Sequence, residues 1–321
     1  MHFKRVDANK VEGFCLVKTA TRKTSVKGSA YMDFMLIDND GEISAKLWDY
    51  APALHGDYKG GEIVKVRGAL DSYNGSPQLK IERIRIASDS DNPDYEEIVP
   101  CAPYQGKWML EQINAVVGGF KDAELKLVTQ KMLEQAGESL LYYPAALRLH
   151  HAMRGGLLYH TLTVLRLAEQ VCKVYPFLNR ELLLCGVILH DLAKVEELTA
   201  SEFGVASDYS AMGNLIGHLV RGAMRVKSVC DKHAISDHTA MLLEHMLISH
   251  HSEPDYGSPV RPMFLEAEML SMLDDMDAVM YSMSKACEPV AQGGFSERVW
   301  SLDNRKVYRT TKNFAGYSSK L

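Results

Sequence analysis

The sequence predicts a two-domain protein in which an all-β part is followed by an all-helical part. Over the first 86 residues, apolar side chains alternate with polar ones between turn residues, which is typical of short strands. From about residue 104 onward, apolar residues recur at the three- and four-residue spacing of helices. The length of 321 residues also fits about two domains of roughly 150 residues each.

The composition excludes several other classes of protein. With 46% hydrophobic and 24% charged residues, the chain is neither disordered nor collagen-like. Its longest uninterrupted apolar stretch, residues 182–189, is far shorter than the roughly 20 residues of a membrane-spanning helix. The N-terminus does not read as a secretory signal, and the six scattered cysteines contain no C-x-x-C pair. We therefore expect a cytoplasmic protein with free thiols and no membrane partner.

The N-terminal part is expected to contain five strands, near residues 11–17, 31–37, 42–48, 62–68 and 78–86. Turns are predicted at 39–41 and at Asn74-Gly75, because Asn and Gly tolerate positive φ. A helix-like interruption at residues 50–54 separates the third strand from the fourth. Five strands with this interruption match an OB barrel over residues 1–87. The same number of strands fits a small SH3-like barrel, and we favour the OB barrel.

Charge is distributed unevenly along the chain. Residues 1–86 contain 14 basic and 11 acidic residues, a formal charge of +3, whereas the remainder has a charge of −8. OB barrels bind single-stranded nucleic acid through a basic groove with aromatic side chains on which bases stack. The expected contacts are Phe14, Lys18, Arg22, Lys23, Lys27, Tyr31, Phe34, Lys46 and Trp48. About half of these aromatic residues fit the barrel core equally well.

Residues 88–103 contain five acids, three prolines and no base, which predicts a linker. A helical domain is expected over residues 104–285, followed by a tail over 286–321. No internal repeat is visible.

Ten of the twelve histidines lie between His150 and His251, within the predicted helical domain. A lone buried histidine is more often a hydrogen-bonded core residue than a metal ligand. His160, however, lies on the apolar stripe of a predicted helix, and His190-Asp191 ends a helix that is apolar on most sides. A buried imidazole and carboxylate are costly without a compensating charge, which a divalent cation would supply.

His218, His250 and Asp274 follow in later helical segments, which completes the order H…HD…H…H…D. This ordered set resembles the HD superfamily of metal-dependent phosphohydrolases. The resemblance implies one metal bound by His160, His190, Asp191 and Asp274, and a second bound by His218 and His250 with Asp191 as the bridge. A set of imidazoles and carboxylates without thiolates suits Mn²⁺, Fe²⁺ or Zn²⁺.

The same resemblance implies roles for neighbouring residues. Lys194 stands at the lysine position of the common His-Asp-x-Gly-Lys form, although Ala193 replaces the glycine. Lys194 and Arg154 are the candidates for holding the scissile phosphate beside Asp191. Arg154 precedes a Gly-Gly step, and an arginine in that position could equally cap a helix or pair with a surface acid.

Four further residues are neighbours of the expected ligands. His251 is a metal ligand or a substrate contact; we favour His250 as the ligand, because adjacent helical residues differ in direction by about 100°. Asp277 lies one turn after Asp274 and is expected to orient an imidazole. His150 and His151 are left unassigned.

A barrel, an acidic linker and an HD domain together resemble the YhaM-type 3′-to-5′ exoribonucleases of Gram-positive bacteria, over nearly the whole chain. The matching segments are 150–162, 188–194, 249–251, 294–298 and 302–305. Departures are Tyr159, where an acid is expected, and Ser252-Glu253, where a glycine is common. The resemblance implies a Mn²⁺-dependent enzyme that releases nucleoside monophosphates from the 3′ end of single-stranded RNA, with single-stranded DNA as a second substrate.

Two other functions fit parts of the pattern. One is an HD phosphohydrolase of a small nucleotide, such as a nucleoside triphosphate or a cyclic dinucleotide, in which the barrel serves regulation or assembly. The other is a non-catalytic nucleic-acid-binding protein, which the intact set of motif elements disfavours. The sequence leaves the oligomeric state open, a homo-oligomer included.

Overall fold

The computed structural model describes residues 10–26, 28–39, 41–73, 76–91 and 93–312. The chain forms two compact units, Met1–Cys101 and Ala102–Leu321, each of which is described by itself. Lys27 and the predicted turn at Asn74-Gly75 lie outside the described residues. No helix in the described part of the chain is long and apolar enough to cross a membrane.

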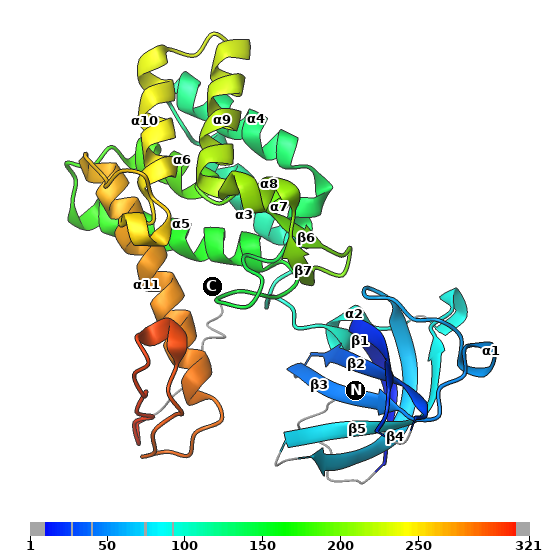
Figure 1. The fold of residues 1–321 in the computed structure, drawn as a ribbon. Coiled ribbons are helices and arrows are strands. Elements are labelled where there is room, and N and C mark those ends of the chain that lie inside the picture. The colour runs from blue at the N-terminus through cyan, green and yellow to red at the C-terminus, as the bar shows by residue number, and fades with distance from the viewer. Residues whose placement is uncertain (1–9, 27, 40, 74–75, 92, 313–321) are drawn as a thin grey trace. The chain divides into compact units, whose positions relative to one another are not determined.

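The first unit is a closed barrel of five strands in the order β1-β2-β3-β5-β4 (Figure 1). Its elements are β1 (Lys10–Thr24), β2 (Ala30–Asp38), β3 (Gly41–Leu47), α1 (Pro52–His55), β4 (Ile63–Tyr73) and β5 (Ser76–Ile86). β3 pairs with β5 in parallel and every other pair is antiparallel. This order, with α1 between β3 and β4, is that of an OB barrel and confirms the favoured alternative.

Side chains alternate across the barrel wall as the period of two requires. On β4, Val64 and Val66 are buried in the barrel, whereas Lys65 between them points outward and lies over the ring of Phe14. The barrel has its own hydrophobic core, separate from that of the helical unit.

The segment 88–103, which the sequence predicts to be a linker, is folded along most of its length. It contains a 3₁₀ turn (Asp89–Asp91) and a short helix, α2 (Tyr95–Ile98). Ile98 and Val99 are buried, and the amide of Asn39 donates to the carbonyl of Glu97 at 3.4 Å. The first unit therefore extends to Cys101, because two apolar residues anchor this acidic segment.

The second unit is helical, with one departure from the expected class. Its elements are α3 (Gly106–Gly118), α4 (Ala123–Ala136), α5 (Gly156–Val174), α6 (Arg180–Leu189), α7 (Lys194–Glu197), α8 (Ala211–Leu215), α9 (Gly217–Lys232), α10 (Asp237–Ser249) and α11 (Leu265–Cys287), with 3₁₀ turns at Glu138–Leu141, Pro254–Tyr256 and Trp300–Leu302. A two-stranded sheet of β6 (Leu198–Ala200) and β7 (Ala206–Tyr209) interrupts the helices. The unit as a whole thus has a small β component that the apolar spacing did not reveal.

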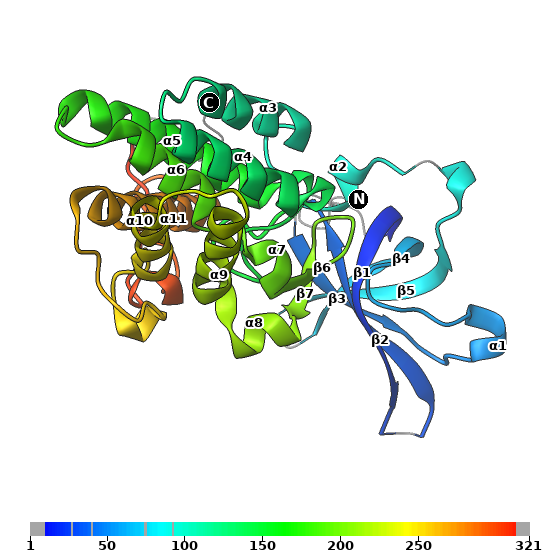
Figure 2. The same ribbon diagram turned by 90° about the horizontal axis from the view of Figure 1, so that it is seen from above.

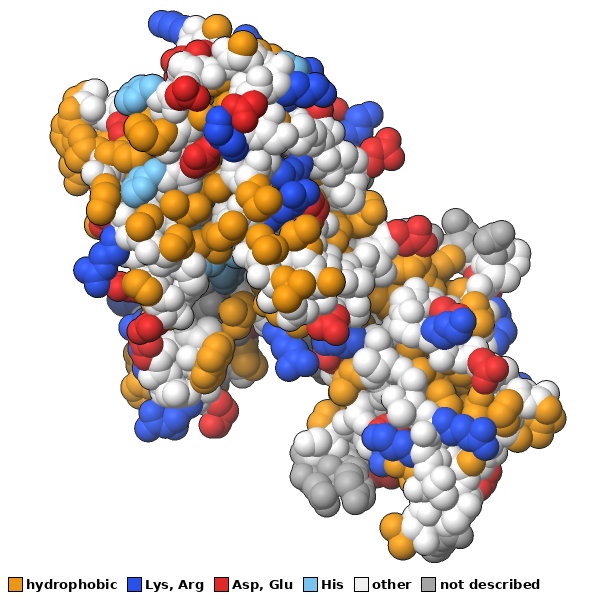
Figure 3. Space-filling model, turned by 45° about the horizontal axis from the view of Figure 1, so that its top comes forward, with side chains coloured by type: hydrophobic (Ala, Val, Ile, Leu, Met, Phe, Trp, Pro, Cys, Tyr) orange, Lys and Arg blue, Asp and Glu red, His pale blue; other side chains and the backbone are white. Residues whose placement is uncertain are grey.

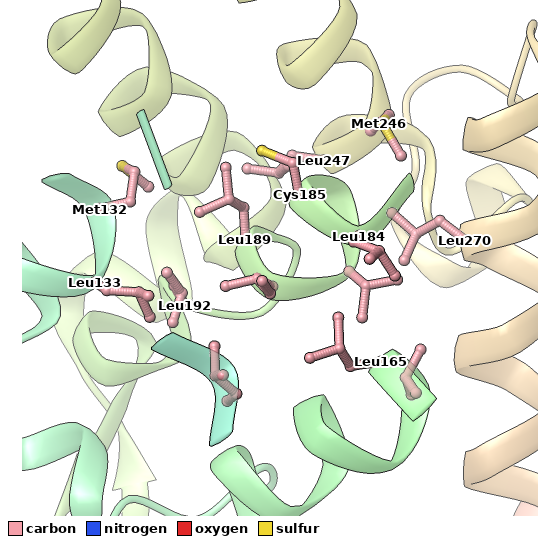
Figure 4. Packing of buried hydrophobic residues seen from close by; sticks show 14 of the residues in the cluster. Met132, Leu133, Leu165, Leu184, Cys185, Leu189, Leu192, Met246, Leu247 and Leu270 are labelled. Atoms are coloured by element: carbon pink, nitrogen blue, oxygen red, sulfur yellow. The ribbon is translucent and has the colours of Figure 1, made fainter. Parts of the chain in front are cut away.

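Helix α6 lies at the centre of the second unit and contacts α4, α5, α10 and α11 (Figure 2). The side chain of Asn179 caps its first turn by accepting from the amide of Leu182. All eight residues 182–189 are buried. Figure 4 shows Leu184, Cys185 and Leu189 among side chains of the surrounding helices. Because α6 is enclosed in this way, the two polar residues after it, His190 and Asp191, are fixed inside the protein.

Candidate metal centre and nucleic-acid surface

Six predicted ligands meet at the end of α6. His190 and Asp191 follow that helix directly, His160 lies in the second turn of α5, and His218 stands in the first turn of α9. His250 follows the last residue of α10, and Asp274 comes from α11. All are buried except Asp274, whose side chain keeps 14% of its surface exposed. The structure therefore brings the six together from five separate elements.

The first group of ligand atoms surrounds one oxygen of Asp191. Nε2 of His160 lies 3.2 Å from Nε2 of His190 and 3.1 Å from Oδ1 of Asp274. Oδ2 of Asp191 is 3.4 Å from Nε2 of His190 and 3.8 Å from Nε2 of His160. Two imidazoles and two carboxylates thus converge within the space that a single cation would fill.

The second group lies on the other oxygen of the same carboxylate. Oδ1 of Asp191 is 3.4 Å from Nε2 of His218 and 3.8 Å from Nε2 of His250. Each oxygen of Asp191 thus faces a different set of imidazoles. A carboxylate in this position can bridge two cations.

His251 belongs to this second group as well. Its ring nitrogen and those of His218 and His250 all lie within 4.8 Å of one another. The directions of His250 and His251 would differ by about 100° within a continuous helix, but α10 ends at Ser249 and both histidines lie beyond it. The chain turns here, and Nδ1 of His251 donates to the carbonyl of Tyr256 at 2.9 Å.

The Nδ1 atoms of four histidines are held by acceptors on the protein. Nδ1–H donates at 2.7–2.9 Å in four pairs: His160 to Asp277, His190 to the carbonyl of Val187, His218 to Glu197 and His250 to the carbonyl of Leu247. These bonds fix each ring so that Nε2 faces the cluster, the arrangement that partners of metal-binding histidines usually produce.

Of the two carboxylates that accept from these rings, Asp277 was predictable from the sequence and Glu197 was not. Asp277 was expected to orient an imidazole, and it accepts from His160. The same oxygen, Oδ2, also accepts from Nε2 of His151 at 2.8 Å, which gives that unassigned histidine a place behind the cluster. Sequence reasoning missed Glu197, because its contact with His218 spans 21 residues and no periodic pattern marks it.

The local charges are strongly coupled. Burial alone would lower the pKa of His160, but its hydrogen bonds to Asp274 and Asp277 outweigh burial and raise the pKa to about 10. Burial likewise acts to raise the pKa of Asp191, yet Lys194 and His190 hold it well below its usual range. Nζ of Lys194 lies 2.6 Å from Oδ2 of Asp191. In the absence of a cation, protons and an ammonium group therefore balance the buried carboxylates.

The donor atoms fit divalent cations by one further observation. Oδ1 of Asp191, Nε2 of His218 and Nε2 of His250 are buried atoms with no hydrogen-bond partner among the described residues. Buried polar atoms without partners are rare and costly in proteins. Three of them, one carboxylate oxygen and two imidazole nitrogens, face one another here. A bound cation would satisfy all three at once.

Arg154, predicted to hold the phosphate, is directed elsewhere. Its guanidinium lies 5.4 Å from the ring centroid of Tyr142 and donates to the carbonyl of Glu202 at 2.6 Å. Of the two cations expected near the phosphate, the structure brings only Lys194 to the cluster. Arg154 instead ties the turn between β6 and β7 to the segment before α5.

On the barrel, three of the predicted nucleic-acid contacts share one outer face. The rings of Tyr31 on β2 and Trp48, just after β3, lie 4.8 Å apart between centroids. Nζ of Lys46 is 5.4 Å from each ring centroid. Trp48 is 40% exposed, so this cluster offers an accessible aromatic surface next to a cation.

The other predicted contacts divide into core and surface residues. Phe34 is 2% exposed and packs edge-on against Tyr58, so its assignment to nucleic-acid binding was wrong: its position on β2 points inward. Lys18 and Lys23 are paired with Glu42 and Asp33. The surface candidates Arg22 and Phe14 lie on β1, where Arg22 is exposed and Phe14 is half-buried beneath Lys65.

These features define a class of protein in which an OB barrel is followed by a helical unit with an HD-type cluster of histidines and aspartates. The HD domain family model matches residues 157–279, which contain all the ligands named above. Similar proteins include the 3′-5′ exoribonuclease YhaM of Listeria welshimeri, at 38% identity over 94% of this chain and 95% of that protein. The YhaM of Bacillus velezensis is 35% identical over the same shares. The chain therefore belongs to the YhaM family of 3′-5′ exoribonucleases.

One solved structure resembles the barrel. It is the second OB-fold domain of replication protein A from Methanococcus maripaludis, at 19% identity and a TM-score of 0.20, and the match covers 24% of this chain and 83% of that one. The OB assignment rests on the strand order of the barrel.

Proposed function

We propose that this protein is a metal-dependent 3′-to-5′ exoribonuclease that hydrolyses single-stranded RNA to nucleoside monophosphates. One observation carries the proposal: the two oxygens of Asp191 face two groups of oriented imidazoles, and several of these buried donor atoms have no hydrogen-bond partner within the described part of the chain. This is the arrangement that hydrolysis of a phosphodiester by two cations requires. Family membership supplies the substrate and its polarity.

The cations that we propose are Mn²⁺, with Fe²⁺ and Zn²⁺ as alternatives that the same donors accept. The proposed ligands are His160, His190, Asp191 and Asp274 for the first position, and Asp191, His218, His250 and His251 for the second. When bound, such cations supply positive charge at the phosphate and lower the pKa of a bound water.

The chain's own residues supply the remaining steps. Asp191 and the imidazoles, fixed through Nδ1, hold the donor atoms in place without rearrangement. Nζ of Lys194 lies beside Asp191 and is the group that we assign to a non-bridging phosphate oxygen. Arg154 has no part in this proposal, because its guanidinium is engaged elsewhere.

We assign substrate capture to the barrel. Tyr31 and Trp48 offer stacking surfaces to bases, and Lys46 offers charge to the phosphate backbone. Single-stranded RNA is the proposed ligand and single-stranded DNA a second one. Hydrolysis is assigned to residues 104–285, with 286–321 as an associated tail, and the proposed location is the cytoplasm.

A time course with end-labelled RNA tests the proposal. Purified protein with Mn²⁺ should shorten 5′-labelled single-stranded RNA stepwise and release labelled mononucleotide at once from 3′-labelled RNA. Asp274→Asn should abolish both, whereas Asp275→Asn, a matched change at the exposed neighbour, should not. Intact RNA in every lane, with Mn²⁺ shown to be bound, would refute the proposal and favour a small nucleotide as the substrate.

A further inference from the structure

The C-terminal segment after α11 forms a hairpin. The proposed roles of the metal cluster and of the barrel give this hairpin no function. Residues 293–299 pair with 305–309: the amide of Ser296 donates to the carbonyl of Val307, and Phe295 and Tyr308 form a bridge. Asp303 and Asn304, both at positive φ, make the tip. The hairpin is thus a defined element of the unit.

One face of this hairpin packs on α11. Leu302 and Val307 are buried together with Cys287, against side chains of α11 that include Val279 and Met283. This anchoring fixes the backbone of the hairpin on the helix that also carries Asp274. From Asp274 to Cys287, α11 extends about 20 Å at 1.5 Å per residue.

Three aromatic side chains of the hairpin are exposed. Trp300 is 75% exposed, Phe295 63% and Tyr308 45%, and the centroids of Phe295 and Tyr308 lie 5.0 Å apart. Aromatic side chains this exposed in one small element are unusual, because their burial is favourable. In Figure 3, hydrophobic and basic side chains lie close together at the lower end of the helical unit, where Figure 1 shows the hairpin.

Charge identifies the ligand that this face fits. Residues 288–312 contain five basic and three acidic residues, a formal charge of +2, whereas residues 102–287 have a charge of −6. Four of the five cations are exposed and form no ion pair with any described residue: Arg298, Arg305, Lys306 and Lys312. Proteins bind single-stranded nucleic acid with exposed aromatic rings that lie among basic side chains.

We propose that the outer face of this hairpin, formed by Phe295, Trp300 and Tyr308 with the surrounding cations, binds single-stranded RNA upstream of its 3′ end. The inference rests on the proposed exonuclease function. The hairpin packs on α11 from Val279 to Cys287, about 8 to 20 Å along the helix from Asp274, so at about 3.4 Å per stacked nucleotide it lies on the order of two to six nucleotides from an RNA end at Asp274. RNA longer than about six nucleotides spans this whole length while its end lies at Asp274.

Binding of a 5′-labelled 20-nucleotide oligouridine to the full chain in EDTA tests this, because the RNA then stays intact. Phe295→Ala/Trp300→Ala should weaken binding at least about tenfold, given what stacking contributes per base. The conservative variant Trp300→Phe should keep most of the RNA affinity of the wild type. The matched control is Tyr175→Ala/Phe177→Ala, which removes another exposed ring pair of the helical unit.

Fluorescence gives a direct second readout. With Trp48→Phe and Trp108→Phe, Trp300 is the remaining tryptophan of the chain, and the oligouridine should quench it. Unchanged affinity in the double variant, or no quenching, overturns the proposal. A fall in molecular mass by light scattering with unchanged RNA affinity also overturns it and assigns the face to a second copy. If the wild type degrades RNA, these outcomes reject only the proposal that the hairpin binds RNA. If the wild type neither binds nor degrades RNA, the proposed exonuclease function fails as well.

Discussion

Oε1 of Glu197 lies 2.9 Å from Nδ1 of His218 and also accepts from the backbone amide of that residue. The ring of His218 is therefore held with Nε2 toward Asp191. Glu197→Gln should loosen the second position only and reduce Mn²⁺ affinity there by about 10- to 100-fold. Metal analysis and electron paramagnetic resonance should count about one tightly bound Mn²⁺ in place of two. Glu202→Gln, on the exposed turn nearby, should keep both, and equal stoichiometry in the two variants would contradict the role given to Glu197.

Lys194 and Arg154 should behave differently when each is replaced by alanine. Lys194 lies at the cluster, so Lys194→Ala should reduce kcat by about 100-fold or more. Arg154→Ala removes a cation–π contact and a hydrogen bond, and should cost on the order of 1–2 kcal/mol in the free energy of unfolding. Steady-state kinetics and thermal unfolding separate the two effects. A large kcat loss in Arg154→Ala with unchanged stability would return that residue to the site.

Mn²⁺ affinity should rise with pH. The folded-state pKa of His160, raised to about 10, exceeds its ordinary value of 6.5, so the protonated ring stabilises the metal-free fold below pH 6.5, and this contribution is lost as pH rises through about 10. A cation must displace that proton, so affinity should increase by up to about tenfold per pH unit. Calorimetry in buffers of different ionisation enthalpy counts the released protons. Asp277→Asn removes the negative charge beside Nδ1 of His160 and should lower the count; an unchanged count would exclude His160 as the proton source.

Two aromatic residues of the barrel make a matched pair. Trp48→Ala should weaken RNA binding by about 1–3 kcal/mol, because an exposed stacking surface is lost, and leave stability nearly unchanged. Phe34→Leu should cost about 1 kcal/mol of stability and leave RNA affinity unchanged, because Phe34 lies in the core. Anisotropy with labelled RNA and thermal unfolding provide the two readouts. The reverse pattern would place the binding surface elsewhere.

The histidines that meet in the cluster and the division into two units were predictable from sequence, because motif order and apolar period are local properties. The partners of those ligands were mostly not. Glu197 and His151 contact the cluster through tertiary packing, and no spacing rule marks them. Burial of Phe34 depends on which side of β2 faces the barrel, and a strand buried or half-buried on both faces gives a weak alternation. The burial of Ile98 and Val99 did not follow from the sequence, because the five acidic residues of their segment are typical of an exposed linker.

The wide spacing of the proposed ligands along the chain also affects the resistance of the protein to unfolding and proteolysis. His160 and Asp274, the first and last proposed ligands, lie 114 residues apart in sequence, and the cluster joins segments from α5 to α11. A cation held there closes several long loops, so it acts on the chain's entropy much as a cross-link does, and it binds only the folded form. Depletion of metal should therefore lower the unfolding temperature of the helical unit and expose it to proteases, while the barrel, with a separate core, unfolds as before. The supply of metal would then set the abundance of the protein as well as its rate of RNA hydrolysis.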